Sequence, residues 1–225
     1  MYDVLIGMES SGAVREACRA LGIKAWSCDL LPADDGSPYH IQGDVFTVAS
    51  KYHWRAGVFH PSCTFLTCSA AWAFNDPDLE KYPGVGYHQK VKPDTLTGVA
   101  RRIARTEALA DVQRLLDLPF PKVIENPSTS FINKAIRPPD QIIQPHQFGD
   151  DASKGTGLWF DRVGPLVLDP AKQVKPRIVN GRPRWANQTD SGQNRLPPSD
   201  DRWKARSKTY PGIASALAKL LEEFT

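Results

Sequence analysis

Short apolar runs alternate along the chain with segments in which apolar residues recur at helical spacing. The runs at 3–8 ("DVLIGM"), 23–31 ("IKAWSCDLL") and 55–59 ("RAGVF") have the length of buried strands. Residues 13–22 ("AVREACRALG") have helical spacing and end at a glycine. Residues 40–46 ("HIQGDVF") predict a further strand, with an acidic residue after a glycine. The N-terminal part of the chain therefore predicts alternating strands and helices.

The alternation continues in the rest of the chain. Residues 122–127 ("KVIENP") and 166–170 ("LVLDP") predict strands, and residues 211–224 predict a helix that begins at a proline. Residues 73–94 are polar and rich in Gly and Pro, which predicts a long loop. Residues 95–118 predict the strongest helix, with an apolar stripe that comprises Val99, Ile103, Leu109, Val112, Leu115 and Leu116.

Strands that alternate with helices favour an α/β fold of the Rossmann-like kind. We expect a mostly parallel sheet with helices on both faces, in a single domain over residues 1–225. Ligands of such sheets bind at the carboxyl ends of the strands. The polar clusters fall there: Glu9 to Gly12, Asp29, Asp44, Pro61 to Cys63 and Glu125 to Pro127. Their convergence on one rim is the main reason to predict an active site.

Composition narrows the class of protein. The 225 residues are 41% hydrophobic and 24% charged, which is ordinary for a globular domain. No apolar run approaches the roughly 20 residues of a membrane span, and the N-terminus has no basic flank typical of a signal peptide. The four cysteines have no zinc-type spacing, so we expect free thiols in a reducing cytoplasm, no metal and no membrane partner. We also expect a monomer.

The charge is unevenly distributed. The formal net charge is only +3. Residues 172–208 hold ten basic and three acidic side chains, so the rest of the chain is net acidic. A basic segment on an acidic body favours a polyanionic partner. A merely solvated surface remains the alternative.

The first loop and two acidic strand ends predict an adenosine-containing cofactor. Gly12 in "ESSG" permits a tight turn into a helix, whose N-terminus favours an anionic or polar group. Asp29 has the spacing of a carboxylate that accepts hydrogen bonds from ribose hydroxyls. Asp44 is placed to accept from an adenine amino group. For both acids, a role as a turn or N-cap residue is the alternative.

The order of these features resembles that of the pyrimidine carbon-5 DNA methyltransferases, which use S-adenosylmethionine. That family has a Pro-Cys nucleophile loop after the fourth strand and a Glu-Asn pair after the fifth, which match Cys63 and Glu125-Asn126. Residues 209–225 resemble its C-terminal segment, which packs beside the first strand. The chain is most similar to short phage-encoded cytosine methyltransferase-like proteins. The resemblance implies a class I methyltransferase fold and a location in the cytoplasm of a bacterial host.

The resemblance also implies roles for individual residues. Cys63 would add to carbon 6 of cytosine, and Glu125 would have to be protonated, or share a proton, to take up charge at ring nitrogen 3. Cys63 as a core thiol is the alternative, and Cys68 is the better structural cysteine. Catalytic candidates are Cys63, Glu125 and Asn126; cofactor candidates are Glu9, Ser10, Ser11, Gly12, Asp29, Leu30, Asp44, Val45 and Pro61; substrate candidates are His60, Ser62, Pro127, Lys154, Thr156, Trp185 and Arg206.

The sequence departs from the family pattern in three places. Proline precedes the cysteine by two positions, as Pro61-Ser62-Cys63. The Gln-x-Arg-x-Arg strand is missing, and Lys154 or Thr156 are its possible substitutes. Only residues 169–207, a basic segment with Trp185 and Trp203, are available to recognise a substrate by tracking phosphates and stacking a base.

Three functions stay open at this point. The first is methylation of cytosine carbon 5 in DNA. The second is the same chemistry on a free pyrimidine nucleotide such as dCMP, which the small recognition segment favours. The third is a catalytically silent module that binds nucleic acid or cofactor. Methylation of an exocyclic amine is disfavoured, because "HPSCTF" lacks an acid or amide at its first position.

Overall fold

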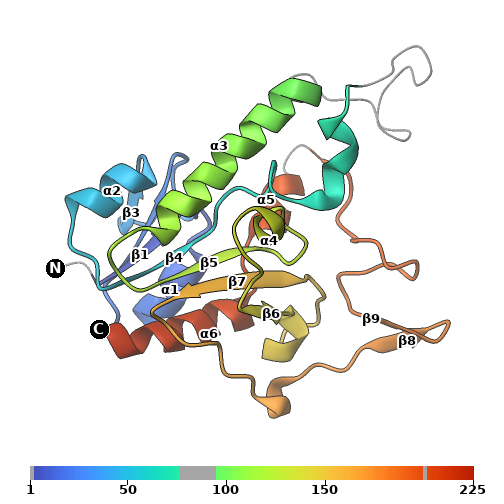
Figure 1. Ribbon diagram of the computed structural model, residues 1–225. Helices are drawn as coiled ribbons and strands as arrows, with labels where there is room; N and C mark the ends of the chain where they lie inside the picture. The colour runs from blue at the N-terminus through green and yellow to red at the C-terminus, as the bar shows by residue number, and fades with distance from the viewer. Residues whose placement is uncertain (1–2, 77–94, 200–201) are drawn as a thin grey trace.

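The computed structural model describes residues 3–76, 95–199 and 202–225. Its centre is a seven-stranded sheet in the order β3-β2-β1-β4-β5-β7-β6 (Figure 1). β1 to β5 are mutually parallel, whereas β7 runs antiparallel to both of its neighbours, β5 and β6. The strands are β1 (Val4–Gly7), β2 (Ala25–Asp29), β3 (His40–Gln42), β4 (Ala56–Phe59), β5 (Lys122–Pro127), β6 (Gln141–Ile143) and β7 (Thr156–Asp161).

Helices cover both faces of the sheet. α1 (Ala13–Ala20) and α6 (Pro211–Leu221) pack side by side on one face, and α2 (Val45–Lys51) and α3 (Gly98–Leu116) lie on the other (Figure 1). The alternation of side chains along β1 shows why. Val4 and Ile6 belong to the core under α1 and α6, whereas Leu5 belongs to the core under α2 and α3. The expected Rossmann-like α/β fold is confirmed.

The C-terminal helix is fitted tightly against the rest of the molecule. A Cβ atom at Gly212 would lie 2.2 Å from the carbonyl oxygen of Phe148, so only glycine fits there. The Gly212 amide donates to Asp150 Oδ2 at 2.9 Å. Ile213, Leu217 and other apolar residues of α6 are buried in the same core as β1. This close approach positions α6 beside α1.

Smaller elements complete the described chain. The segment after β7 is extended, with a hairpin formed by β8 (Arg177–Val179) and β9 (Arg182–Arg184) and, closer to the body, the short helix α5 (Arg202–Ser207) (Figure 1). The remaining elements are α4 (Ile132–Ala135) and the 3-10 helices η1 (Cys68–Phe74), η2 (Pro145–Phe148), η3 (Pro170–Lys172) and η4 (Glu222–Phe224).

Two local predictions were wrong. Residues 166–170 form no strand, because the chain there has already left the sheet and leads into η3. The predicted stripe of α3 is buried only at its C-terminal end, at Val112 and Leu115, while Val99 and Ile103 are each 56% exposed. The N-terminal half of α3 extends beyond the sheet in Figure 1, so the sheet does not cover it. Most of the predicted loop at 73–94 lies outside the described residues.

Candidate active site

The candidate site lies at the point of the sheet where the strand order reverses. β1 and β4 are neighbours in the sheet, but their connections lead to opposite faces. Ligands of doubly wound sheets bind in the crevice at such a point. The loop after β1 holds Glu9 to Gly12, and the loop after β4 holds His60 to Cys63.

Cys63 begins a single helical turn directly after β4. Its carbonyl oxygen accepts hydrogen bonds from Leu66 N at 3.1 Å and Thr67 N at 2.9 Å. From α3, the buried Arg101 donates to the Thr64 carbonyl at 2.8 Å. The turn is thus fixed from both sides, while the Cys63 side chain is exposed to solvent. Cys63 is therefore not a core thiol.

A second set of hydrogen bonds joins this turn to the loop after β5. Asn126 is 1% exposed, and its Nδ2 donates to the Pro61 carbonyl at 2.8 Å. Phe131 N and Ser130 Oγ both donate to the Leu66 carbonyl, at 2.6 and 3.2 Å. Asn126 therefore holds the cysteine loop against β5, which is a positioning role.

Glu125 lies at the end of β5 and faces His60. Its Oε2 accepts a hydrogen bond from His60 Nδ1 at 3.2 Å, and both side chains are largely buried. Burial alone would raise the pKa of Glu125, but the hydrogen bond from His60 and the charge of Lys154 outweigh it, and the pKa is lowered. The carboxyl is therefore ionised at neutral pH. This differs from the protonated or proton-sharing acid that the sequence suggested.

The Cys63 thiol shares the same electrostatic neighbourhood. Although Cys63 is exposed, the protein around it removes part of the water from the sulfur, which raises its pKa; the charge of Glu125 raises it further, and the charges of Lys154 and Arg206 act in the opposite direction. The net shift is upward, so the resting group is a thiol. Cys63 thus interacts electrostatically with groups from three other segments of the chain, Glu125, Lys154 and Arg206. Ser62, the residue before Cys63, is exposed.

The first loop has the features of a cofactor cradle. Gly12 has φ 72°, and a Cβ there would lie 2.1 Å from a guanidinium nitrogen of the buried Arg15. Glu9 is 6% exposed, and its Oε1 accepts from Ser11 Oγ at 2.8 Å and Val14 N at 3.2 Å. Its Oε2 is buried with no hydrogen-bond partner among the described residues. An unpartnered carboxylate oxygen on this rim fits a ligand with hydrogen-bond donors.

The acidic strand ends already have local partners. Asp29 Oδ1 accepts from Leu31 N at 2.9 Å, which makes a turn. Asp44 is the N-cap of α2, because its Oδ2 accepts from the amide and the hydroxyl of Thr47 at 2.8 Å each. Among the other cofactor candidates, Ser10 accepts from Asp34 N through its carbonyl, Leu30 is 72% exposed, Val45 is buried and Pro61 is buried.

Other substrate candidates lie in different surroundings. Thr156 and Pro127 are register partners in the β5–β7 pair, and the Thr156 side chain contributes to the lowered pKa of Glu125, after the effects of burial and His60. Trp185 is stacked on His146, with ring centroids 4.3 Å apart, so that its ring packs on η2. Trp203 of α5 is 58% exposed.

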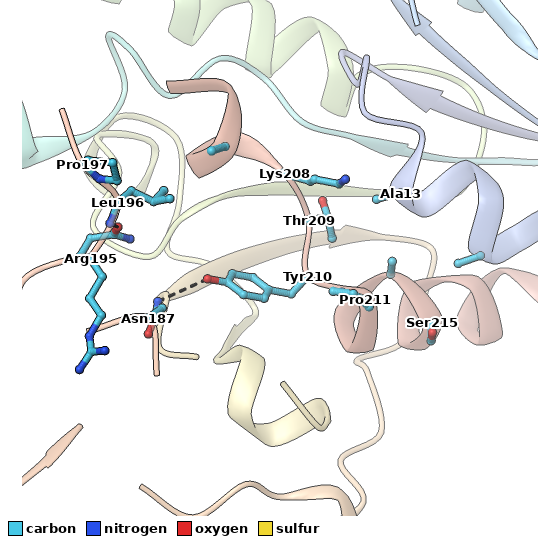
Figure 2. A pocket seen from close by; sticks show the side chains of 14 residues that line it. Ala13, Asn187, Arg195, Leu196, Pro197, Lys208, Thr209, Tyr210, Pro211 and Ser215 are labelled. Atoms are coloured by element: carbon cyan, nitrogen blue, oxygen red, sulfur yellow. Dashed lines mark hydrogen bonds between the residues drawn. The ribbon is translucent and has the colours of Figure 1, made fainter. Parts of the chain in front are cut away.

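A cavity of about 680 Å³ adjoins the start of α1, next to the first loop. It lies between α1, α6, α5 and the 187–197 segment, and Tyr210 crosses it toward Asn187, whose Nδ2 donates to the phenol oxygen at 3.3 Å (Figure 2). Its lining includes Arg195 and Lys208 and no acidic side chain. Ala13, directly after Gly12, lines it, whereas Glu9, Asp29 and Asp44 do not.

Sequence reasoning missed two functional contacts. Arg101 lies in the helix predicted at residues 95–118, and no sequence pattern indicates that it would hydrogen-bond to the cysteine loop. His60 was placed beside the substrate, but its contact with Glu125 spans 65 positions and has no local signal. Among the described residues, no helix is long and apolar enough to cross a membrane, and no group of three His, Cys, Asp or Glu side chains could hold a metal ion.

Comparison with known proteins finds similarity to solved structures. No protein-family model and no curated protein matches the chain. A similar solved structure is the Dnmt2 methyltransferase of S. pombe, with 16% identity and a TM-score of 0.38 over 70% of this chain. The match spans 48% of that protein, so this chain corresponds to about half of its length.

Proposed function

We propose that this protein transfers a methyl group from S-adenosylmethionine to carbon 5 of cytosine in DNA. The observation that carries the proposal is the grouping of an exposed cysteine with a buried carboxylate on adjacent parallel strands, β4 and β5. The positive charge of Lys154 acts on both groups, and that of Arg206 acts on the thiol. A nucleophile and an acid–base group on one rim are the two functions that this chemistry requires.

The residues act on the pyrimidine in sequence. The exposed Cys63 thiol releases its proton to solvent, and its sulfur adds to carbon 6, so that the electron pair of the ring double bond moves through carbon 4 to nitrogen 3. Lys154 and Arg206 stabilise the thiolate that precedes addition. Glu125 would lie beside nitrogen 3, where the charge develops and a proton has to be supplied. Loss of the proton on carbon 5 then expels the thiol and restores the aromatic ring.

The cofactor would occupy the rim formed by the first loop and the ends of β2 and β3. Glu9, through its unpartnered oxygen, and Gly12, through close backbone approach, would hold it, together with Asp29 and Asp44. When bound, S-adenosylmethionine supplies the electrophilic methyl group that carbon 5 takes up.

The basic segment supports a nucleic-acid substrate. Residues 172–208 carry most of the excess positive charge, and Arg206 connects this segment electrostatically to Cys63. Trp203, on the same helix as Arg206, offers an exposed ring to an adjacent base. A target cytosine in duplex DNA would have to be flipped out to reach the thiol. Binding would weaken steeply as salt is raised.

A free pyrimidine nucleotide is the second candidate. The observation that favours it is the small size of the segment between β7 and α6, which contains the three-residue strands β8 and β9 and the short helix α5 within the described residues. Reading a DNA sequence normally needs an element that enters the major groove. A compact segment of this kind is sufficient to close over a single nucleotide.

The deciding experiment measures transfer of labelled methyl to duplex DNA, single-stranded DNA and dCMP in parallel. We expect labelled DNA with the wild type, no label with Cys63→Ala, and unchanged binding of S-adenosylmethionine by calorimetry. Cys68→Ala is the matched control, because Cys68 is also exposed and lies five positions away. Label only in dCMP would replace DNA by the nucleotide. Inertness of the wild type on all three would leave a silent binding module.

A further inference from the structure

His60 follows β4 directly, and its side chain contacts Glu125. Its backbone amide donates to the Gly7 carbonyl at 3.0 Å, which extends the pairing of β4 with β1 by one residue. Its side chain is 10% exposed, and Nδ1 lies 3.2 Å from Glu125 Oε2. Nε2 is buried without a hydrogen-bond partner among the described residues. One ring nitrogen is thus committed to the carboxylate, and the other keeps its hydrogen-bonding capacity.

The charges around this pair come from several elements. Glu125 belongs to β5, Lys154 to the segment before β7 and Cys63 to the loop after β4, and the charge of Arg206, from α5, acts on the Cys63 thiol. Burial favours the neutral form of Glu125, but His60 and Lys154 hold its pKa below the ordinary value. An ionised carboxylate has no proton to give to nitrogen 3. A proton can reach this atom through Glu125 from a group that contacts the carboxylate, and His60 makes that contact at 3.2 Å.

We propose that His60 is the proton source for ring nitrogen 3, acting through Glu125 as a relay. The inference rests on the function proposed above and assigns a positioning and proton-supplying role to a residue that does not itself have to touch the substrate. It accounts for the direct contact between His60 and Glu125 and for the burial of both side chains.

The proton balance of the step is closed. The proposed step starts from the form of the pair in which His60 carries a hydrogen on each ring nitrogen and Glu125 is a carboxylate. As the sulfur–carbon 6 bond forms and the displaced electron pair reaches nitrogen 3, His60 Nδ1 passes its proton to Glu125 Oε2, and that proton then moves from the carboxyl to nitrogen 3. The products are neutral His60 with hydrogen on Nε2, ionised Glu125 and protonated nitrogen 3. Expulsion of the thiol returns the proton along the same route.

The test compares His60→Asn with His60→Ala and the wild type. The asparagine amide can still donate to Glu125 from about the position of Nδ1, but it cannot release a proton. We expect kcat to fall about 100-fold in His60→Asn, with KM unchanged and with a changed pH profile of kcat, because loss of general acid catalysis costs about 10²–10⁴-fold. His53→Asn is the control, since His53 is exposed and lies outside this contact.

Two further measurements keep the inference separable from the proposed function. If His60 acts through Glu125, the double variant His60→Asn/Glu125→Gln will be no slower than Glu125→Gln alone. Carbon-13 NMR of the Glu125 carboxyl, which needs no activity, should show its titration midpoint rising in His60→Ala. A kcat near the wild-type value in His60→Asn, additive losses, or an unchanged midpoint would overturn the inference. Failure of the wild type to methylate any pyrimidine would instead overturn the function.

Discussion

Replacing Asn126 by alanine tests how the cysteine loop is held against β5. Asn126 is 1% exposed, and its Nδ2 donates to the Pro61 carbonyl at 2.8 Å, two residues before Cys63. The change leaves that carbonyl without this donor and opens a small void. A buried polar group that loses its partner costs about 1–3 kcal/mol, so we expect the free energy of unfolding to fall by about 2 kcal/mol.

For a chain of this size, a loss of about 2 kcal/mol corresponds to a decrease in Tm of about 4–8 °C. Thermal unfolding followed by circular dichroism measures this, and alkylation by iodoacetamide reports the mobility of Cys63. We expect faster alkylation in Asn126→Ala. The matched control is Gln141→Ala at the far edge of the sheet, where the side-chain amide bonds Leu166 O at 3.0 Å and Leu166 N at 2.9 Å. It should lower Tm without changing alkylation. An unchanged Tm in Asn126→Ala would refute the reasoning.

Glu125, Gly212 and Asp44 each give one further prediction. Burial raises the pKa of Cys63 and the charge of Glu125 raises it further, so Glu125→Gln should lower that pKa and speed alkylation at pH 7.5. Gly212→Ala should lower Tm, because its Cβ would meet the last carbonyl of η2 at 2.2 Å and overpacking costs about 1–3 kcal/mol. Asp44→Ala should lower stability by about 1 kcal/mol through loss of the α2 N-cap, whereas Asp44→Asn should keep the cap and weaken cofactor binding.

Each of these predictions has its own contrary result. Unchanged or slower alkylation in Glu125→Gln would contradict the effect of its charge on Cys63. A Gly212→Ala variant as stable as the wild type would mean that α6 can shift away from η2. For Asp44, burial is outweighed by the hydrogen bonds from Thr47, and the pKa is lowered. Its contribution is therefore present above the ordinary carboxyl pKa and lost as the pH falls through the folded value. An Asp44→Ala defect that persists unchanged at pH 2 would contradict this.

Much of the fold could be predicted because its signals are local. The strand runs in "DVLIGM" and "RAGVF" are short and apolar on both faces, as buried parallel strands require. The position of Cys63 and Glu125 on neighbouring strand ends followed from chain order and the rule that parallel strands end at one edge. The buried length of the apolar stripe on α3 was overestimated, because periodicity cannot show where the sheet beneath a helix ends.

The finer properties of the site depend on contacts that no local pattern encodes. The ionisation of Glu125 is set by His60 and Lys154, which lie 65 positions before it and 29 after it. Trp185 looked available for stacking, but its ring is packed on His146. Arg101 supports Thr64 across 37 positions. Such pairings come from tertiary packing, and they decide the protonation state of the groups in the site.

The most direct test of the central claim is a covalent trap. DNA that contains 5-fluorocytosine is incubated with the protein and S-adenosylmethionine, and the digested complex is examined by mass spectrometry. Fluorine at carbon 5 cannot leave as a proton does, so the thiol that has added to carbon 6 stays attached. The account predicts a stable adduct on Cys63 that is absent in Cys63→Ala and retained in Cys68→Ala. DNA that is methylated without an adduct, or an adduct on Cys68, would contradict it.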